Sequence, residues 1–220
     1  MIDYQIIKKN ELFRGIEDDN LKSILSCLSA KVLVYKKGEY VYMTGENINH
    51  IGILLKGQVV VLKEDEDGNT NILSEISQSE MFGEALACAE IEISSVSVQA
   101  VETSEILLID YKKIIRTCSS ACIFHTMLIE NMLKILARKT IILNQKMEIL
   151  SKKTIREKLM AFFALQKNIA NSNVFTIPYN REQLSNYLYV DRSALSRELG
   201  KMRDEGLIRF KKNKFELIEY

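Results

Sequence analysis

Between positions 32 and 110 the apolar residues come in short runs separated by turn signals, many of them glycines. The runs are VLVY (32–35), YVYM (40–43), IGILL (51–55), QVVVLK (58–63), NILSEI (71–76), VSVQAV (96–101) and ILLID (106–110). Strands this short, with a turn about every ten residues, are typical of a sandwich, a jelly roll or a barrel. The pattern therefore predicts a β domain in the N-terminal half of the chain.

The pattern becomes helical after residue 118, and no Gly or Pro occurs from 119 to 166. One set of positions, called the seam below, advances by alternating fours and threes and is apolar at six of seven places, as in a helix that packs along a partner helix. A neighbouring stripe is also apolar and could rest on the β domain. The pattern favours a homodimer, and an ordinary core helix within one subunit is the alternative. The seam is Ile129, Leu133, Leu136, Thr140, Leu143, Met147 and Leu150; the stripe is Leu128, Met132, Ile135, Ile142 and Ile149.

A helix-turn-helix is predicted near the C-terminus, after a helix expected over 154–166. Asn180 and Gln183 have the spacing of a capping box, and the helix they begin would bury Leu184 and Leu188. About three residues of turn lead to Asp191, the expected N-cap of a second helix over 192–203.

The second helix has two distinct faces. Its apolar residues recur at i, i+4 and i+7 and form an inward face, whereas Ser193, Arg197 and Lys201 lie opposite, with Ser196 beside them and Arg192 in the first turn. Short polar side chains let a helix enter the major groove of DNA, and an arginine can bind a guanine edge through two hydrogen bonds. We interpret this as a recognition helix; a solvated amphipathic helix is the alternative. The inward residues are Leu195, Leu199 and Met202.

A basic hairpin follows the second helix. Gly206 ends the helix, and residues 207–218 read as two strands around Lys211-Lys212-Asn213-Lys214. A basic hairpin directly after a helix-turn-helix is typical of a wing that contacts phosphates beside the groove. Lys212 in the wing and Arg181 at the start of the first helix complete the predicted DNA-binding residues.

The charge of the chain is divided unequally. Residues 151–220 hold 14 Lys and Arg against 8 Asp and Glu, whereas residues 1–150 hold 16 against 21. The C-terminal part therefore carries +6 and the rest −5, although the whole chain carries only +1. A basic domain joined to an acidic one indicates that the C-terminal part meets a polyanion.

Other functional classes find little support. The four cysteines form no CxxC pair and only two histidines are present, so no metal site is predicted. The sequence has no Ser/His/Asp arrangement and no phosphate-binding glycine loop, and we do not expect an enzyme. No apolar run reaches the length of a membrane span and no signal peptide precedes the first runs, so we expect a cytoplasmic protein without a membrane partner.

Nearly the whole chain resembles the Crp/Fnr family of bacterial transcription regulators. NREQLSNYLYVDRSALSRELGKMRDEGLI (180–208) is similar to the family's DNA-binding signature, and KKGEYVYMTGEN (36–47), IGILLKGQVVV (51–61) and FGE (82–84) are similar to its sensor domain. The resemblance implies an α+β chain: an N-terminal antiparallel β-roll of the jelly-roll type with flanking helices that senses an effector (1–118), a long dimerisation helix (119–151) and a winged helix-turn-helix (152–220).

By the same resemblance, Arg192, Ser193, Ser196 and Arg197 contact base edges of a palindromic operator, and RNA polymerase is a possible partner. A glutamate often found in the family at the position of Ser193 is missing. The family's best-known half-site is therefore not expected here. A small-molecule sensing module that acts through protein contacts is the alternative function.

The family's cyclic-nucleotide cassette is changed in this chain. Gly83 and Glu84 are present, but the phosphate-binding arginine is replaced by Ser94, which Ser95 follows. Residues 64–111 contain no Lys or Arg against twelve Asp and Glu, including Glu90 and Glu92. A buried phosphate without a cation is costly, so we expect an effector other than cyclic AMP, uncharged or cationic, or none. The resemblance places Leu143 and Asn144 on the same pocket.

The cysteines and histidines bear on two other cofactors, an iron–sulfur cluster and haem. The iron–sulfur members use four cysteines, three of them clustered near the N-terminus, whereas here Cys27 is the only cysteine before Cys88, so a cluster is disfavoured. Haem remains an open alternative, since His50, His125 or a cysteine could ligate it.

Overall fold

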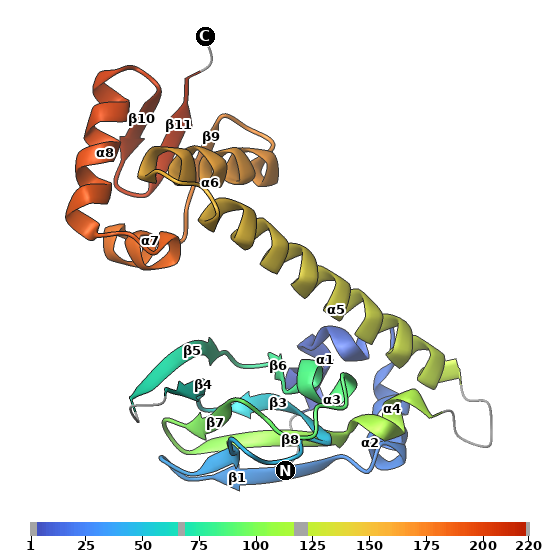
Figure 1. Ribbon diagram of the computed structural model, residues 1–220. Helices are drawn as coiled ribbons and strands as arrows, with labels where there is room; N and C mark the ends of the chain where they lie inside the picture. The colour runs from blue at the N-terminus through green and yellow to red at the C-terminus, as the bar shows by residue number, and fades with distance from the viewer. Residues whose placement is uncertain (1–3, 66–68, 117–122, 219–220) are drawn as a thin grey trace. The chain divides into compact units, whose positions relative to one another are not determined.

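The computed structural model describes residues 4–65, 69–116 and 123–218. The chain forms two compact units, Met1–Ala137 and Arg138–Tyr220. The fold class is α+β, as predicted, with an antiparallel β domain, a long helix and a winged helix-turn-helix (Figure 1).

The first unit contains two four-stranded antiparallel sheets. Their strand orders are β1-β8-β3-β6 and β2-β7-β4-β5. All seven apolar runs of the sequence form strands, with bounds that shift by one or two residues. The eighth strand, β6, was not predicted, because two residues are too few to show a period. The strands are β1 (Lys31–Tyr35), β2 (Tyr40–Tyr42), β3 (His50–Lys56), β4 (Val59–Glu64), β5 (Thr70–Ile76), β6 (Met81–Phe82), β7 (Ser97–Ala100) and β8 (Ser104–Asp110).

The central strand β3 explains why this core needs a glycine. Residues 51–55 of β3 are all buried, so the strand reads as a continuous apolar run rather than an alternating one. Gly52 pairs with Phe82 in the β3–β6 ladder, and a Cβ on Gly52 would lie 2.3 Å from the Phe82 ring. Only glycine lets the ring pack on the strand at this point.

Short helices flank the β domain. They are α1 (Tyr4–Lys9), the 3-10 helix η1 (Glu11–Phe13), α2 (Asp18–Cys27), α3 (Glu84–Cys88) and α4 (Tyr111–Ile115). Ile7, Leu12, Phe13 and Leu21 of the N-terminal helices are buried in the same core as the sheets. Flanking helices were expected, but their bounds were not, because helices this short carry little periodic signal.

The long helix α5 (Ile123–Leu150) contributes to both units, whose boundary falls within it. Leu128, Met132 and Ile135 are buried in the core of the first unit, as the predicted stripe requires. The rest of the stripe does not follow that prediction: Ile142 is 58% exposed, and Ile149 is buried in the core of the second unit. Among the described residues, no helix is both long and apolar enough to cross a membrane.

The second unit is a winged helix-turn-helix. Its elements are α6 (Ile155–Ala170), β9 (Val174–Thr176), α7 (Arg181–Leu188), α8 (Arg192–Asp204), β10 (Ile208–Lys211) and β11 (Lys214–Leu217). The three strands form one antiparallel sheet in the order β10-β11-β9. β9 was not predicted. Phe162 and Phe163 of α6 are fully buried, and the Phe163 ring packs on Phe175 and Phe215 of the sheet.

Candidate nucleic-acid interface

The helix-turn-helix has the local geometry that the sequence predicted. Asn180 caps α7 by accepting a hydrogen bond from the Gln183 backbone N–H, while the Gln183 side chain accepts one from the Asn180 N–H, both at 2.9 Å. α7 ends at Leu188 and is followed by its C-cap, Tyr189, whose φ of 52° is left-handed; α8 begins three residues after Tyr189. This reciprocal cap satisfies two backbone donors that a helix N-terminus leaves without partners.

The two faces of α8 differ as expected. Leu195, Leu199 and Met202 are buried, with exposed fractions of 0 to 1%, together with Leu184 and Leu188 of α7. The predicted DNA-contacting residues of α8 are all exposed: Arg192, Ser193, Ser196, Arg197 and Lys201. A buried apolar face thus holds a rigid polar face toward solvent. The role of that face in binding DNA stays a prediction.

Asp191 organises the first turn of α8. Its carboxylate accepts hydrogen bonds from the Ala194 N–H at 2.8 Å and from the Ser193 hydroxyl at 2.5 Å. The hydrogen bond from Ser193 lowers the pKa of Asp191, and the cap and the charge of Arg197 lower it further. Asp191 is therefore ionised at neutral pH.

Arg156 of α6 holds α8 in place, a role the sequence pattern did not indicate. Its guanidinium donates one hydrogen bond to Glu198 at 2.5 Å and two to Glu205, at 2.7 and 2.8 Å. The Arg156 bonds lower the pKa of Glu205 and raise that of Arg156 itself. Glu198 and Glu205 lie 42 and 49 positions after Arg156 along the chain, so no local spacing could have revealed the contact.

The wing turn is held against the loop before α7. Asn213 donates its side-chain amide to the Ile177 carbonyl at 3.1 Å, and the Ile177 N–H donates to the Asn213 carbonyl at 3.0 Å. Lys212 precedes Asn213 with a left-handed φ of 55° and is exposed. The turn therefore presents one lysine from a fixed backbone position.

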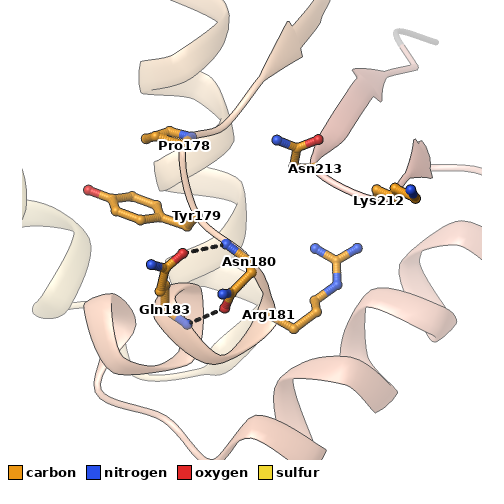
Figure 2. A pocket seen from close by; sticks show the side chains of 7 residues that line it. All are labelled: Pro178, Tyr179, Asn180, Arg181, Gln183, Lys212 and Asn213. Atoms are coloured by element: carbon orange, nitrogen blue, oxygen red, sulfur yellow. Dashed lines mark hydrogen bonds between the residues drawn. The ribbon is translucent and has the colours of Figure 1, made fainter.

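A pocket of roughly 500 Å³ lies between the start of α7 and the wing turn. Figure 2 shows the Arg181 side chain reaching from α7 toward Lys212 and Asn213. The Arg181 guanidinium lies 4.8 and 5.0 Å from the ring centres of Phe210 and Phe215, and partial burial lowers its pKa. Two cations and a helix N-terminus at one pocket suit a phosphate. The lining residues are Pro178, Tyr179, Asn180, Arg181, Gln183, Lys212 and Asn213.

The cassette of the sensor domain is closely packed at its start. Gly83 has φ +79°, and a Cβ there would lie 2.9 Å from the Tyr42 ring, so glycine is required. Glu84 begins α3 and is buried. The Tyr111 hydroxyl donates to the Glu90 carboxylate, and this raises the pKa of Tyr111 to about 12. The bond ties the cassette, at Glu90, to the start of α4.

Ser94 does not offer its hydroxyl to a ligand. The residue is 1% exposed, and its hydroxyl donates to the Val96 carbonyl at 2.7 Å and accepts from the Val96 N–H at 3.2 Å. Ser95 is exposed. Leu143 and Asn144 are exposed residues of the second unit, so the expectation that they complete the pocket stays a prediction.

The described residues include two histidines and two cysteines, and one of each are in contact. His50 is exposed, whereas His125 is buried with its Nε2 3.8 Å from the Cys27 sulfur. Cys27 and Cys88 are free thiols, while Cys118 and Cys122 lie outside the described residues. Within the described ranges, no three His, Cys, Asp or Glu side chains gather as a metal ion would require.

The seam of α5 is uncovered over much of its length in the single chain. Leu133, Leu143 and Met147 are 62, 58 and 61% exposed. Thr140 is also exposed, while Ile129, Leu136 and Leu150 are half-buried. Apolar side chains this exposed on one helix are typical of an interaction surface, and the dimer interface stays a prediction.

Two family models match the chain, one in each unit. Residues 32–121 match the cyclic nucleotide-binding domain, and residues 157–219 match the Crp-like helix-turn-helix domain. The first match covers strands β1 to β8, and the second covers α7, α8 and the wing.

Similar proteins are known from several bacteria. A cAMP-activated global transcriptional regulator, CRP, of Pasteurella multocida is 42% identical over 69 residues, which is 31% of this chain and 33% of that protein. The transcriptional activator FnrA of Stutzerimonas stutzeri is 24% identical over 79% of this chain and 70% of its own length. The crystal structure of the Thermus thermophilus catabolite activator protein covers 96% of this chain and 94% of its own, with a TM-score of 0.56 and 22% identity, and so shares the fold.

Proposed function

The chain belongs to the Crp/Fnr family of transcription regulators, and from this premise we propose that it acts in the cytoplasm as a homodimer that binds a twofold-symmetric DNA site through α8. Its family consists of transcription regulators rather than enzymes. The observation that carries the proposal is the exposed polar face of α8. The opposite face of α8 is buried in the core of the second unit, and Arg156 holds the helix through Glu198 and Glu205.

The residues divide into base contacts and phosphate contacts. Arg197 is exposed in the middle of α8, where it can reach the O6 and N7 atoms of guanine through two hydrogen bonds. Arg181 and Lys212 line the pocket beside the wing, where they suit the DNA backbone. Phosphate contacts fix the position of the protein on the duplex, and base contacts give the sequence preference.

Dimerisation through the seam of α5 sets the geometry of the operator. A symmetric dimer presents two copies of α8, so the two half-sites are related by a twofold axis. Their centres lie about one helical turn apart, roughly 34 to 36 Å, or a multiple of that distance. The exposed Leu133, Leu143 and Met147 support this interface, because it would remove them from water.

The effector of this chain is not a cyclic nucleotide in our proposal. A bound nucleotide would place its phosphate at the cassette, where the arginine of the family is replaced by a serine that is buried and bonded to its own backbone. The nearby Glu84, Glu90 and Glu92 would add repulsion. An uncharged or cationic ligand, or none, fits these residues better.

Calorimetric titration of the full chain with cyclic AMP and cyclic GMP tests this part of the proposal. We expect no binding at micromolar concentrations. A dissociation constant in the low micromolar range would contradict it, because such affinity requires a cation for the phosphate that residues 64–111 do not contain.

Selection of binding sites from random duplexes tests the function itself. The purified full chain should enrich a twofold-symmetric sequence, and Arg197→Ala should lose about 1 to 3 kcal/mol on that site with relaxed preference for one base pair. Failure of the wild-type chain to enrich any sequence would instead favour a sensing module that acts through protein contacts.

A further inference from the structure

The first turn of α8 contains a side-chain hydrogen bond that capping of the helix does not require. Asp191 already caps α8 through the Ala194 N–H at 2.8 Å. The same carboxylate oxygen also accepts the Ser193 hydroxyl at 2.5 Å. Ser193 is exposed and stands on the polar face of α8, four residues before Arg197 and on the same side of the helix.

This bond fixes the direction of the Ser193 hydroxyl. A serine hydroxyl has one proton to donate and two lone pairs with which to accept, whereas an ionised carboxylate can only accept. Because the pKa of Asp191 is lowered, the carboxylate is ionised at neutral pH and Ser193 must be the donor. The proton therefore points at Asp191, and only lone pairs of the hydroxyl remain for a ligand.

Ser196 provides the contrast. It is also exposed on α8, but its hydroxyl has no hydrogen-bond partner among the residues that the structure describes. It can therefore rotate to donate or to accept. Two serines three residues apart on one helix thus differ in what they can recognise.

Resting on the proposed function, we infer that Ser193 is a specificity-determining residue that reads the exocyclic amino group of cytosine or adenine, and that Asp191 is the positioning residue that imposes this choice. In the major groove, cytosine offers its N4 amine and adenine its N6 amine as donors. Guanine and thymine offer only acceptors there. A hydroxyl held as an acceptor distinguishes between these two pairs of bases.

Base analogues test the reading by Ser193 on the selected operator. Purine in place of adenine, or 2-pyrimidinone in place of cytosine, removes only the amino group. At one position of each half-site this removal should weaken wild-type binding about three- to tenfold, as expected for one hydrogen bond, and should not affect Ser193→Ala. The inference fails if removal of the amino group weakens Ser193→Ala as much as the wild type at every position. It also fails if the analogue to which the variant becomes insensitive is 7-deazaguanine, which lacks the N7 acceptor of guanine.

Asp191→Thr tests the positioning role without removing the cap. A threonine oxygen can still accept from the Ala194 N–H, but a hydroxyl partner can donate as well as accept, so it no longer fixes the Ser193 proton. The variant should bind the operator but tolerate thymine or guanine at the Ser193 position, while the preference that depends on Arg197 persists. Discrimination as sharp as in the wild type would overturn the role of Asp191.

Asp110→Thr is the matched control. Asp110 caps α4 in the first unit through the Lys112 N–H at 2.9 Å, so the same substitution alters a cap far along the chain from α8. It should leave base discrimination unchanged. If the wild-type chain selects no sequence, the proposed function fails; if it selects one whose preferences do not depend on Ser193, only the present inference fails.

Discussion

Arg156 and Glu205 join α6 to the end of α8 through two parallel hydrogen bonds of 2.7 and 2.8 Å. The third bond of Arg156, to Glu198, anchors the same helix about two turns earlier. Because a planar guanidinium donates in a fixed fork, this contact fixes the position of α8 and places one positive charge between the carboxylates of Glu198 and Glu205.

Replacing Arg156 should therefore impair DNA binding more than its single charge explains. Arg156→Ala should weaken binding to the operator more than Arg203→Ala, which also removes one positive charge. Arg203 is exposed, forms an ion pair with neighbouring Asp204 at 2.9 Å and lies 6.0 Å from the ring centre of Phe210, so its contacts are weaker than those of Arg156. Affinities of both variants measured by fluorescence anisotropy at one salt concentration provide the comparison. Equal losses would show that Arg156 contributes charge alone.

Acid should destabilise the second unit through its lowered carboxyl pKa values. Two glutamates of this unit have a pKa below the ordinary glutamate value of 4.5. Glu205 is bonded to Arg156, and Glu157 belongs to the capping box of α6. A carboxyl whose pKa is lowered on folding stabilises the folded state above its unfolded pKa, and this stability is lost as pH falls through the folded value. The midpoint temperature of thermal unfolding should therefore be constant near neutral pH and should fall below about pH 4.5. The midpoint temperature of Glu205→Gln should fall less over the same pH range. An identical pH profile for the variant and the wild type would contradict a stabilising role of the Glu205 carboxylate.

Lys212 in the wing allows charge and backbone strain to be separated. Its φ of 55° is costly for a residue with a Cβ and free for glycine. Lys212→Gly should raise the free energy of unfolding by about 0.5 to 1 kcal/mol. It should also weaken binding to all duplexes alike. The slope of the logarithm of the binding constant against the logarithm of the salt concentration should become shallower by about one unit. Loss of discrimination in a more stable protein would mean that Lys212 contacts a base.

The periodic parts of the chain could be predicted from the sequence, and the parts that depend on distant partners could not. Seven strands, the capping box at Asn180 and the buried face of α8 follow from spacing within a few residues. The Arg156 contact joins positions more than forty residues apart, and the Ser193–Asp191 bond depends on a rotamer. The stripe of α5 shows the same limit: periodicity predicted an apolar face, but could not tell that Ile149 packs in the second unit.

The seam of α5 should hold the dimer together. Leu133→Glu with Leu143→Glu places charges at two exposed seam positions that do not belong to either core, so the chain should fold and sediment as a monomer. Ile141→Glu is the control, because Ile141 is 56% exposed on the same helix but lies outside the seam. A double variant that sediments as a dimer would show that subunits associate elsewhere.

Sequence-specific recognition through α8 can be measured as a ratio of two affinities. These are the affinities of the chain for the selected operator and for a scrambled duplex at one physiological salt concentration. A regulator that reads bases through α8 should bind its operator at least about a thousandfold more tightly than scrambled DNA. Arg197→Ala should reduce that ratio while leaving the scrambled duplex bound nearly as before. Equal affinity of the wild-type chain for both duplexes would contradict sequence-specific recognition by this protein.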